Sequence, residues 1–301
     1  MKLFLLTIFI ALGFVFVPAQ APGRPSPTPS DPLGQAVQRG NEISRRSNDL
    51  RNIEKFPVKN DEDRRVYREQ IEPLYRKLTD SEMETMAVSS EDLAANADFL
   101  KQKGTGIVRL AADRGCSAST GVVSADPQCL KYTMPGAGAA YSFRERRHRL
   151  TRLADINFKG NTFQALGALT HGIMVNIGDV PIENANLETN GAGFLVKLKP
   201  AKDIKKAAEL ATRLTKGIEE DGFRYASILA AKPNSTYLIR SIAYRGKAIK
   251  SAGSFVYNEF EFDDRRDVLV AFRVVRFAAN QSITIVWKEL WNKKSPTIKI
   301  K

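Results

Sequence analysis

Apolar positions along the chain change their period near residue 104, and this change divides the sequence into two regions. Residues 34–103 are highly charged and carry apolar residues at helical spacing. One such stripe consists of Val66, Ile71, Leu74 and Leu78. Thr79 followed by Glu82, and Ser89 followed by Asp92, resemble capping boxes that begin new helices. The pattern predicts either a small helical bundle or a helical layer packed on the following domain.

From residue 106 onward the pattern changes toward strand, with alternation of side-chain character at 141–149 and 173–177. Short strands are predicted at 107–110, 141–149, 173–177 and 194–198, and longer ones at 225–231, 236–245, 254–262, 268–277 and 283–290. Residues 201–221 have the pattern of an amphipathic helix, with Gly222 as its C-cap. Successive strands joined by short links favour an antiparallel sheet. The predicted fold class is therefore α+β: an N-terminal helical region, then a mainly antiparallel sheet over 104–291 covered by one long amphipathic helix.

The first residues have the pattern of an export signal. Lys2 precedes an unbroken apolar run at 3–17, and Ala19 and Ala21 give the small-x-small pattern that signal peptidase recognises. The run is shorter than the roughly 20 residues of a membrane-spanning helix, and no later stretch is long and apolar enough to cross a bilayer. Residues 1–21 are therefore predicted to be a signal peptide, cleaved after Ala19 or Ala21, and the protein to be secreted or periplasmic.

Two further segments and one cysteine pair complete the predicted organisation. Prolines at 22–33 predict a disordered linker, and residues 292–301 form a basic tail that is expected to fray. Cys116 and Cys129 are an even pair in an exported chain, which predicts a disulfide. Closing a loop of this length contributes about 3 kcal/mol in the chain-entropy model. A redox pair or a zinc site would need closer spacing or further ligands.

Positive charge is the main compositional feature. The chain has 46 Lys and Arg residues and 33 Asp and Glu residues, so the formal net charge is +13. This balance favours anionic neighbours such as lipid head groups, cell-wall polymers or nucleic acid. The densest basic segment lies at 142–152, where Arg144, Arg146 and Arg152 would share one face of a strand. A row of guanidinium groups can bind phosphate, carboxylate or sulfate, but charge also protects a sheet edge from pairing. The segment therefore predicts an anion-binding site or an edge strand.

Candidates for catalysis and for cofactor binding are few. Glu259 and Glu261 would share a strand face, with Asp264 close behind them, as would two carboxylates of a glycosidase. Acidic residues that enter a turn beside arginines are also typical of a solvated ion-pair cluster. His148 and His171 have no partner at metal-ligand spacing, and neither a dinucleotide fingerprint nor a serine hydrolase motif occurs. We therefore expect no metal and no cofactor.

Two hypotheses of function follow from these patterns. The preferred one is a non-catalytic exported protein that binds an anionic cell-envelope polymer or lipid head groups through the three arginines, or a protein partner through the helical region. In that case binding should be salt-sensitive and should fall when the arginines become alanine. The alternative is a secreted hydrolase that acts on a polymer through the carboxylate pair.

Overall fold

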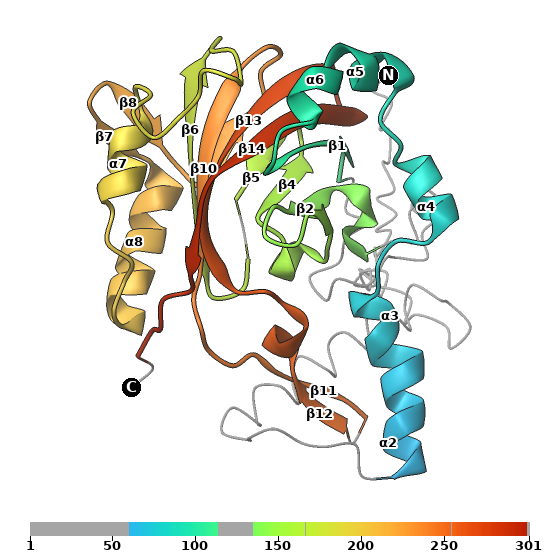
Figure 1. Cartoon of the computed structure of the whole chain (residues 1–301). Coiled ribbons are helices and arrows are strands. Elements are labelled where there is room, and N and C mark those ends of the chain that lie inside the picture. Colours follow the sequence, from blue (N-terminus) through green and yellow to red (C-terminus); the bar gives the residue numbers. More distant parts are fainter. Residues whose placement is uncertain (1–59, 114–134, 166, 254, 300–301) are drawn as a thin grey trace, which may run out of the picture.

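The computed structural model describes residues 60–113, 135–165, 167–253 and 255–299. The predicted signal peptide, the proline-rich linker, residues 34–59 and both cysteines lie outside these described residues. The described chain forms three layers: helices α7 (Ala192–Lys197) and α8 (Ile204–Lys216), a large antiparallel sheet, and a smaller antiparallel sheet (Figure 1). The predicted α+β class with antiparallel sheets is confirmed.

The central layer is a five-stranded antiparallel sheet. Its strands, in spatial order, are β1 (Thr105–Ala111), β14 (Ser282–Lys294), β13 (Arg266–Ala278), β10 (Thr236–Ala243) and β6 (Thr170–Gly178). The predicted hairpin of the last two strands is confirmed, with Ala278 paired to Ser282 across its turn. Both faces of β13 are covered, since Phe272 packs toward the smaller sheet whereas Leu269 and Ala271 pack toward the helices.

The smaller sheet covers one face of the central sheet. It contains β3 (Arg147–His148), β2 (Ala140–Ser142), β4 (Ile156–Lys159), β5 (Thr162–Gln164) and β9 (Ile228–Ala230). Aromatic rings fill the space between the two sheets: the ring centroids of Tyr237 and Phe272 are 5.1 Å apart, and Phe163 meets Phe272 edge-on at 4.9 Å. Trp287 belongs to the same core and is 1% exposed. Large rings therefore hold the two sheets together.

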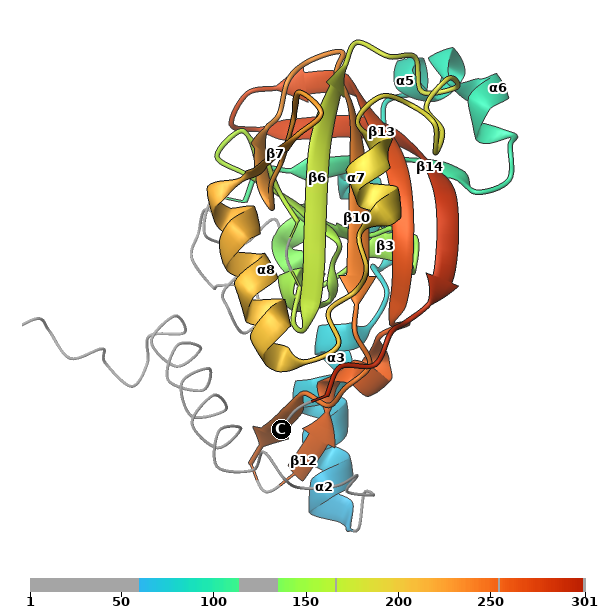
Figure 2. The ribbon, with the colours of Figure 1, turned by 90° about the vertical axis from the view of Figure 1, so that its left-hand side faces the viewer.

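The helices α7 and α8 cover the other face (Figure 2). Leu210 and Leu214 of α8 pack with Ile173 of β6 and Leu238 of β10. The helix is shorter than predicted because it ends at Gly217, whose φ of 91° lies outside the helical region. Strands β7 (Ile218–Glu220) and β8 (Phe223–Tyr225) follow, and the residues between them, at 221 and 222, both have positive φ. The Asp-Gly dipeptide is thus a hairpin turn and not a helix end, and the face is covered by two helices.

Four predicted strands differ from the structure. The one at 225–231 is divided between β8 and β9, which belong to different sheets. The segment at 194–198 is helical in α7, because its short apolar run places Ala192 and Leu195 on one buried helix face. The predicted strand at 141–149 is interrupted between β2 and β3 by a turn in which Arg146 has a φ of 53°. The predicted strand at 254–262 ends with β12 (Phe255–Asn258) and continues as the 3₁₀ helix η4 (Glu259–Phe262). Asn258 begins that helix by accepting a hydrogen bond from the Phe260 N–H.

The described part of the helical region packs against the strands as a layer along one side of the molecule (Figure 1). Its elements are α2 (Asp61–Val66), η1 (Tyr67–Ile71), α3 (Glu72–Tyr75), α4 (Asp80–Thr85), α5 (Ser90–Ala95) and α6 (Ala97–Leu100). Thr79 and Glu82 form the expected capping box. Ile71 and Tyr75 pack with Phe255 and Phe260, near the hairpin of β11 (Ile249–Ala252) and β12. None of the helices in the described part of the chain combines the length and the apolar character that a membrane span requires.

The basic C-terminal tail is docked as far as Lys299, in contrast to the fraying expected from its composition. Strand β14 continues to Lys294, and Ile298 is 5% exposed in a small cluster with Tyr244 and Ile242. Arg245 pairs with Thr297 in an isolated parallel bridge. An apolar residue within a basic run therefore anchors the segment.

Candidate functional site

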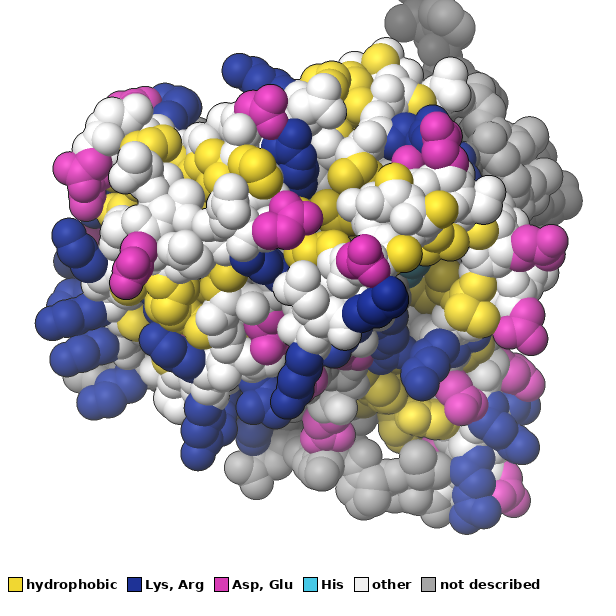
Figure 3. Space-filling model, turned by 45° about the horizontal axis from the view of Figure 1, so that its top comes forward, with side chains coloured by type: hydrophobic (Ala, Val, Ile, Leu, Met, Phe, Trp, Pro, Cys, Tyr) yellow, Lys and Arg dark blue, Asp and Glu magenta, His cyan; other side chains and the backbone are white. Residues whose placement is uncertain are grey.

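The outer side of α8 and the segments beside it carry a surface that we call the lysine face. Its members are exposed cations: Lys197, Lys199, Lys202, Lys205, Lys206, Arg213, Lys216 and Lys299. Asp203 and Glu209 are the carboxylates within residues 197–216. Figure 3 shows Lys and Arg side chains gathering at the lower left of the molecule, on the side where α8 lies. This face has a strong excess of positive charge.

Backbone pairing holds the lysine face on a rigid frame. The Lys299 N–H donates to the Lys202 carbonyl at 3.0 Å, and the Ile204 N–H donates to the Lys299 carbonyl at 3.2 Å. Asp203, which forms a parallel bridge with Lys299, also caps α8 by accepting a hydrogen bond from the Lys206 N–H at 2.9 Å. The start of α8 and the end of the chain are therefore fixed to one another.

Two shallow hollows lie along this face. One, of about 360 Å³, is lined by Leu198, Lys199, Pro200, Ala201, Lys202, Lys206, Glu209, Leu210 and Arg213. The other, of about 590 Å³, is lined by Lys202, Asp203, Ile204, Lys205, Lys206, Glu209 and Lys299. Lys202, Lys206 and Glu209 belong to both, so the two hollows adjoin one another along α8.

The cations of the lysine face have no ion-pair partner among the described residues. Many arginines elsewhere in the described chain are, in contrast, paired with carboxylates. They are Arg64, Arg65, Arg76, Arg144, Arg147, Arg149, Arg152, Arg224, Arg240, Arg265, Arg266, Arg273 and Arg276. Eight exposed cations without such a partner in the described chain thus lie on and beside α8.

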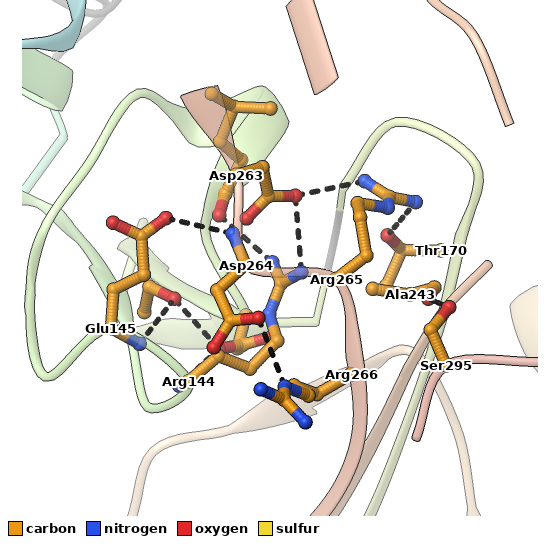
Figure 4. Close-up of polar contacts among 12 residues, drawn as sticks. Arg144, Glu145, Thr170, Ala243, Asp263, Asp264, Arg265, Arg266 and Ser295 are labelled. Atoms are coloured by element: carbon orange, nitrogen blue, oxygen red, sulfur yellow. Dashed lines mark hydrogen bonds and ion pairs between the residues drawn. The ribbon is translucent and has the colours of Figure 1, made fainter. Parts of the chain in front are cut away.

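Arg144, the first of the predicted anion-binding residues, is buried in an internal charge network (Figure 4). Its Nε lies 2.9 Å from the Asp155 carboxylate, and one terminal nitrogen donates to Asp263 at 3.1 Å. The other terminal nitrogen donates to the Leu153 carbonyl at 2.9 Å. Although burial opposes the charge, Asp155 and Asp263 raise the pKa of Arg144 above its ordinary value. Each nitrogen of this guanidinium therefore lies within 3.1 Å of an oxygen atom of the protein itself.

Arg265 completes the network from the other side of Asp263. It donates to the Asp263 carboxylate at 2.9 Å and to the backbone carbonyls of Tyr244 and Leu169 at 2.9 and 2.6 Å. Its guanidinium also lies 3.9 Å from the ring centroid of Phe260. Burial lowers the pKa of Arg265, and the charge of Asp263 opposes that effect. One carboxylate thus joins the turn after β2 to the segment that leads into β13.

The other predicted arginines lie apart from Arg144. Arg146 is exposed at the tip of the β2–β3 turn, with its guanidinium 5.8 Å from the ring centroid of Trp287. Arg152 lies in the 3₁₀ helix η3 (Thr151–Leu153) and donates to the Glu259 carboxylate at 3.1 Å. The prediction that the three share a strand face is wrong, because the turn at Arg146 breaks the period-two pattern. Arg144 and Arg152 are thus used in ion pairs within the protein, whereas Arg146 remains exposed.

The predicted carboxylate pair is not brought together on a strand. Glu259 is 2% exposed and accepts hydrogen bonds from Arg152 and, at 3.3 Å, from the Tyr75 hydroxyl. Glu261 is exposed on the same 3₁₀ helix, and Asp264 is exposed and accepts from Arg266 at 2.9 Å. Among the described residues, no group of three or more His, Cys, Asp and Glu side chains could hold a metal ion.

The groups around Glu259 are poorly suited to proton transfer near neutral pH. Burial, followed by the charge of Glu259, raises the pKa of Tyr75 well above its usual range. Burial also raises the pKa of Tyr257, whose hydroxyl lies 3.1 Å from that of Tyr75, to about 12. Both hydroxyls therefore remain protonated at neutral pH and act as hydrogen-bond donors. The hydrolase hypothesis stays a prediction. The described residues around Glu259 do not pair a general acid with a general base.

Both histidines are buried as structural groups. Burial lowers the pKa of His148 to about 4, and its Nδ1–H donates to the Ala140 carbonyl at 3.2 Å. The Nε2–H of His171 donates to the Ala207 carbonyl of α8 at 2.8 Å. In the neutral ring Nδ1 is then the acceptor, and it lies 2.9 Å from the Tyr244 hydroxyl, which donates to it. The Tyr244 hydroxyl in turn accepts from the Ala201 N–H at 2.9 Å. This chain of bonds ties the lysine face to the central sheet.

Sequence reasoning missed the lysine face although the signal was present. The amphipathic pattern of 201–221 includes several lysines of this face on its polar side, but the arginines at 142–152 form the denser basic segment. Comparison of this chain with protein-family models, with curated protein sequences and with solved structures finds no match.

Proposed function

We propose that this chain is an exported, non-catalytic protein that binds an anionic component of the cell envelope through the lysine face. The observation that carries the proposal is the set of exposed cations around α8 that have no ion pair with any described residue. The pattern of residues 1–21 supports export into the envelope. The Glu259 side chain accepts hydrogen bonds from Arg152 and Tyr75, which suits a structural role for this carboxylate.

The chemistry of the cations suits a charged surface or a linear polymer. An ammonium group is a compact, strongly hydrated charge, so it attracts an anion without requiring one fixed geometry. Helix α8 has 13 residues and is about 20 Å long at 1.5 Å per residue, so it presents several charges in a row. Binding should be salt-sensitive, because exposed charges are screened over about 8 Å at physiological ionic strength.

The test measures binding of the processed protein to long-chain inorganic polyphosphate at low and high salt. One variant neutralises three cations at the start of α8: Lys202→Gln, Lys205→Gln and Lys206→Gln. A matched control removes the same charge from exposed lysines elsewhere: Lys77→Gln, Lys103→Gln and Lys232→Gln. Because a basic residue near an anionic surface contributes about 1 kcal/mol, the first variant should bind roughly a hundredfold more weakly.

The control should retain most of its affinity, since its lysines are spread over other parts of the chain. Equal losses in the two triple variants would show that net charge alone is responsible, and the lysine face would be rejected as a site. Binding that persists at high salt would also contradict the proposal. Export is tested separately by determining the N-terminus of the mature protein, which should follow Ala19 or Ala21.

A further inference from the structure

We infer that the lysine face is a docking site for an anionic lipid bilayer, with Ile204 entering the head-group layer. This inference rests on the proposed function and narrows its ligand from anions in general to a lipid surface. Ile204 is 43% exposed although it is a large apolar residue, and it lines the same hollow as Lys202, Lys205 and Lys299. An exposed apolar side chain beside several lysines is complementary to a surface that is apolar beneath a layer of negative charge.

The frame around Ile204 suits shallow contact with such a surface. The Ile204 N–H is bonded to the Lys299 carbonyl, and Asp203 pairs with Lys299 and caps the helix, so the side chain projects from fixed backbone. The inner face of α8 is occupied, because Leu210 and Leu214 are buried against the central sheet. Only the outer face remains for a membrane. The helix would therefore rest on the lipid surface without leaving the protein core.

The lining of the two hollows favours lipid over other polyanions. Beside the carboxylates of Asp203 and Glu209 it offers ammonium, guanidinium and aliphatic groups, and it contains no aromatic ring on which a nucleic-acid base could stack. Its cations are mainly lysines, which make none of the planar, bidentate contacts that arginine uses to recognise a defined phosphate or carboxylate. An aliphatic side chain is of no use to a hydrophilic polymer, whereas it gains from contact with lipid.

The test compares sedimentation with vesicles of phosphatidylcholine alone and vesicles that contain phosphatidylglycerol, beside polyphosphate binding in solution. Ile204→Ser is the probe, and Leu93→Ser on α5 is its matched control because Leu93 is 42% exposed. Figure 1 shows α5 on the opposite side of the large sheet's upper end from α8. Circular dichroism and thermal unfolding establish that both variants fold. Burying the exposed part of an isoleucine side chain corresponds to roughly a fivefold gain in partitioning.

We expect Ile204→Ser to weaken binding to phosphatidylglycerol vesicles about fivefold while its affinity for polyphosphate stays unchanged, and Leu93→Ser to change neither. An Ile204→Trp variant should show a blue shift of its added fluorescence on these vesicles and none on polyphosphate. Equal vesicle binding by Ile204→Ser and the parent, or binding to polyphosphate without binding to vesicles, would overturn the lipid inference and leave the proposed function intact. Failure to bind either probe would reject the proposed function itself.

Discussion

The charge network around Asp263 makes a specific prediction about stability. The Asp263 side chain is fully buried and accepts from Arg144 at 3.1 Å and from Arg265 at 2.9 Å. Replacing it in the variant Asp263→Asn removes the negative charge and keeps the shape, so two buried guanidinium groups lose their shared partner. Breaking a buried pair in this way costs about 3–5 kcal/mol. Domains are commonly stable by only about 5–15 kcal/mol, so the effect should be large.

The neighbouring residue supplies a matched control. Asp264 is 51% exposed and pairs with Arg266, which is 43% exposed, so solvent screens the pair and Asp264→Asn should cost less than about 1 kcal/mol. Urea unfolding followed by the fluorescence of buried Trp287 measures both variants. A loss below about 1 kcal/mol for Asp263→Asn, or equal losses for the two variants, would refute the view that the network holds the turn after β2 against the segment before β13.

Three further predictions concern stability. Burial lowers the pKa of His148 to about 4, from about 6.5 in an unfolded chain. The neutral ring therefore stabilises the fold above pH 6.5, and about 3 kcal/mol of unfolding free energy is lost as the pH falls from 6.5 to 4. The difference in unfolding free energy between the parent and His148→Gln should therefore shrink over that range in urea titrations. Gly106→Ala should destabilise by about 1–3 kcal/mol, since a Cβ there would lie 2.6 Å from the Trp287 ring, whereas Gly193→Ala has open space and should not destabilise in the same unfolding assay. Tyr244→Phe removes the hydroxyl that accepts from the backbone before α8, so it should cost about 1–3 kcal/mol and speed hydrogen exchange at that amide.

Periodicity predicted the parts of the fold that depend on local pattern. The last two long strands and their hairpin are confirmed, since two long apolar runs joined by a short link are typical of neighbouring antiparallel strands. The shorter apolar runs were ambiguous: residues 194–198 fit a strand or a helix turn equally well, and the position of the segment against the sheet decides for α7. The Asp221–Gly222 turn was misread as a helix end although the same dipeptide is a strong hairpin signal.

The candidate site was harder to predict because its contacts are non-local. Arg144 and Asp263 are 119 positions apart in the sequence, so nothing near Arg144 indicates that it is buried and paired. Glu259 is likewise joined to Tyr75 across 184 positions. Arg144 and Glu259 were predicted to be functional because of their neighbours in the sequence. Their side chains are instead occupied by partners that only the fold brings close.

The different chemistry of arginine and lysine explains why the densest basic segment is not the one most accessible to an external anion. A guanidinium group has five donors in a fixed plane, so Arg144 and Arg265 can each bind a carboxylate and backbone carbonyls at once inside the protein. An ammonium group loses more hydration on burial, and the lysines beside α8 accordingly remain in solvent. Arginines that lie beside several acidic residues therefore form ion pairs within the protein, as Arg144 does with Asp155 and Asp263. Lysines along an exposed helix with few carboxylates keep their charge for an external partner, and in this chain that condition is met at the lysine face.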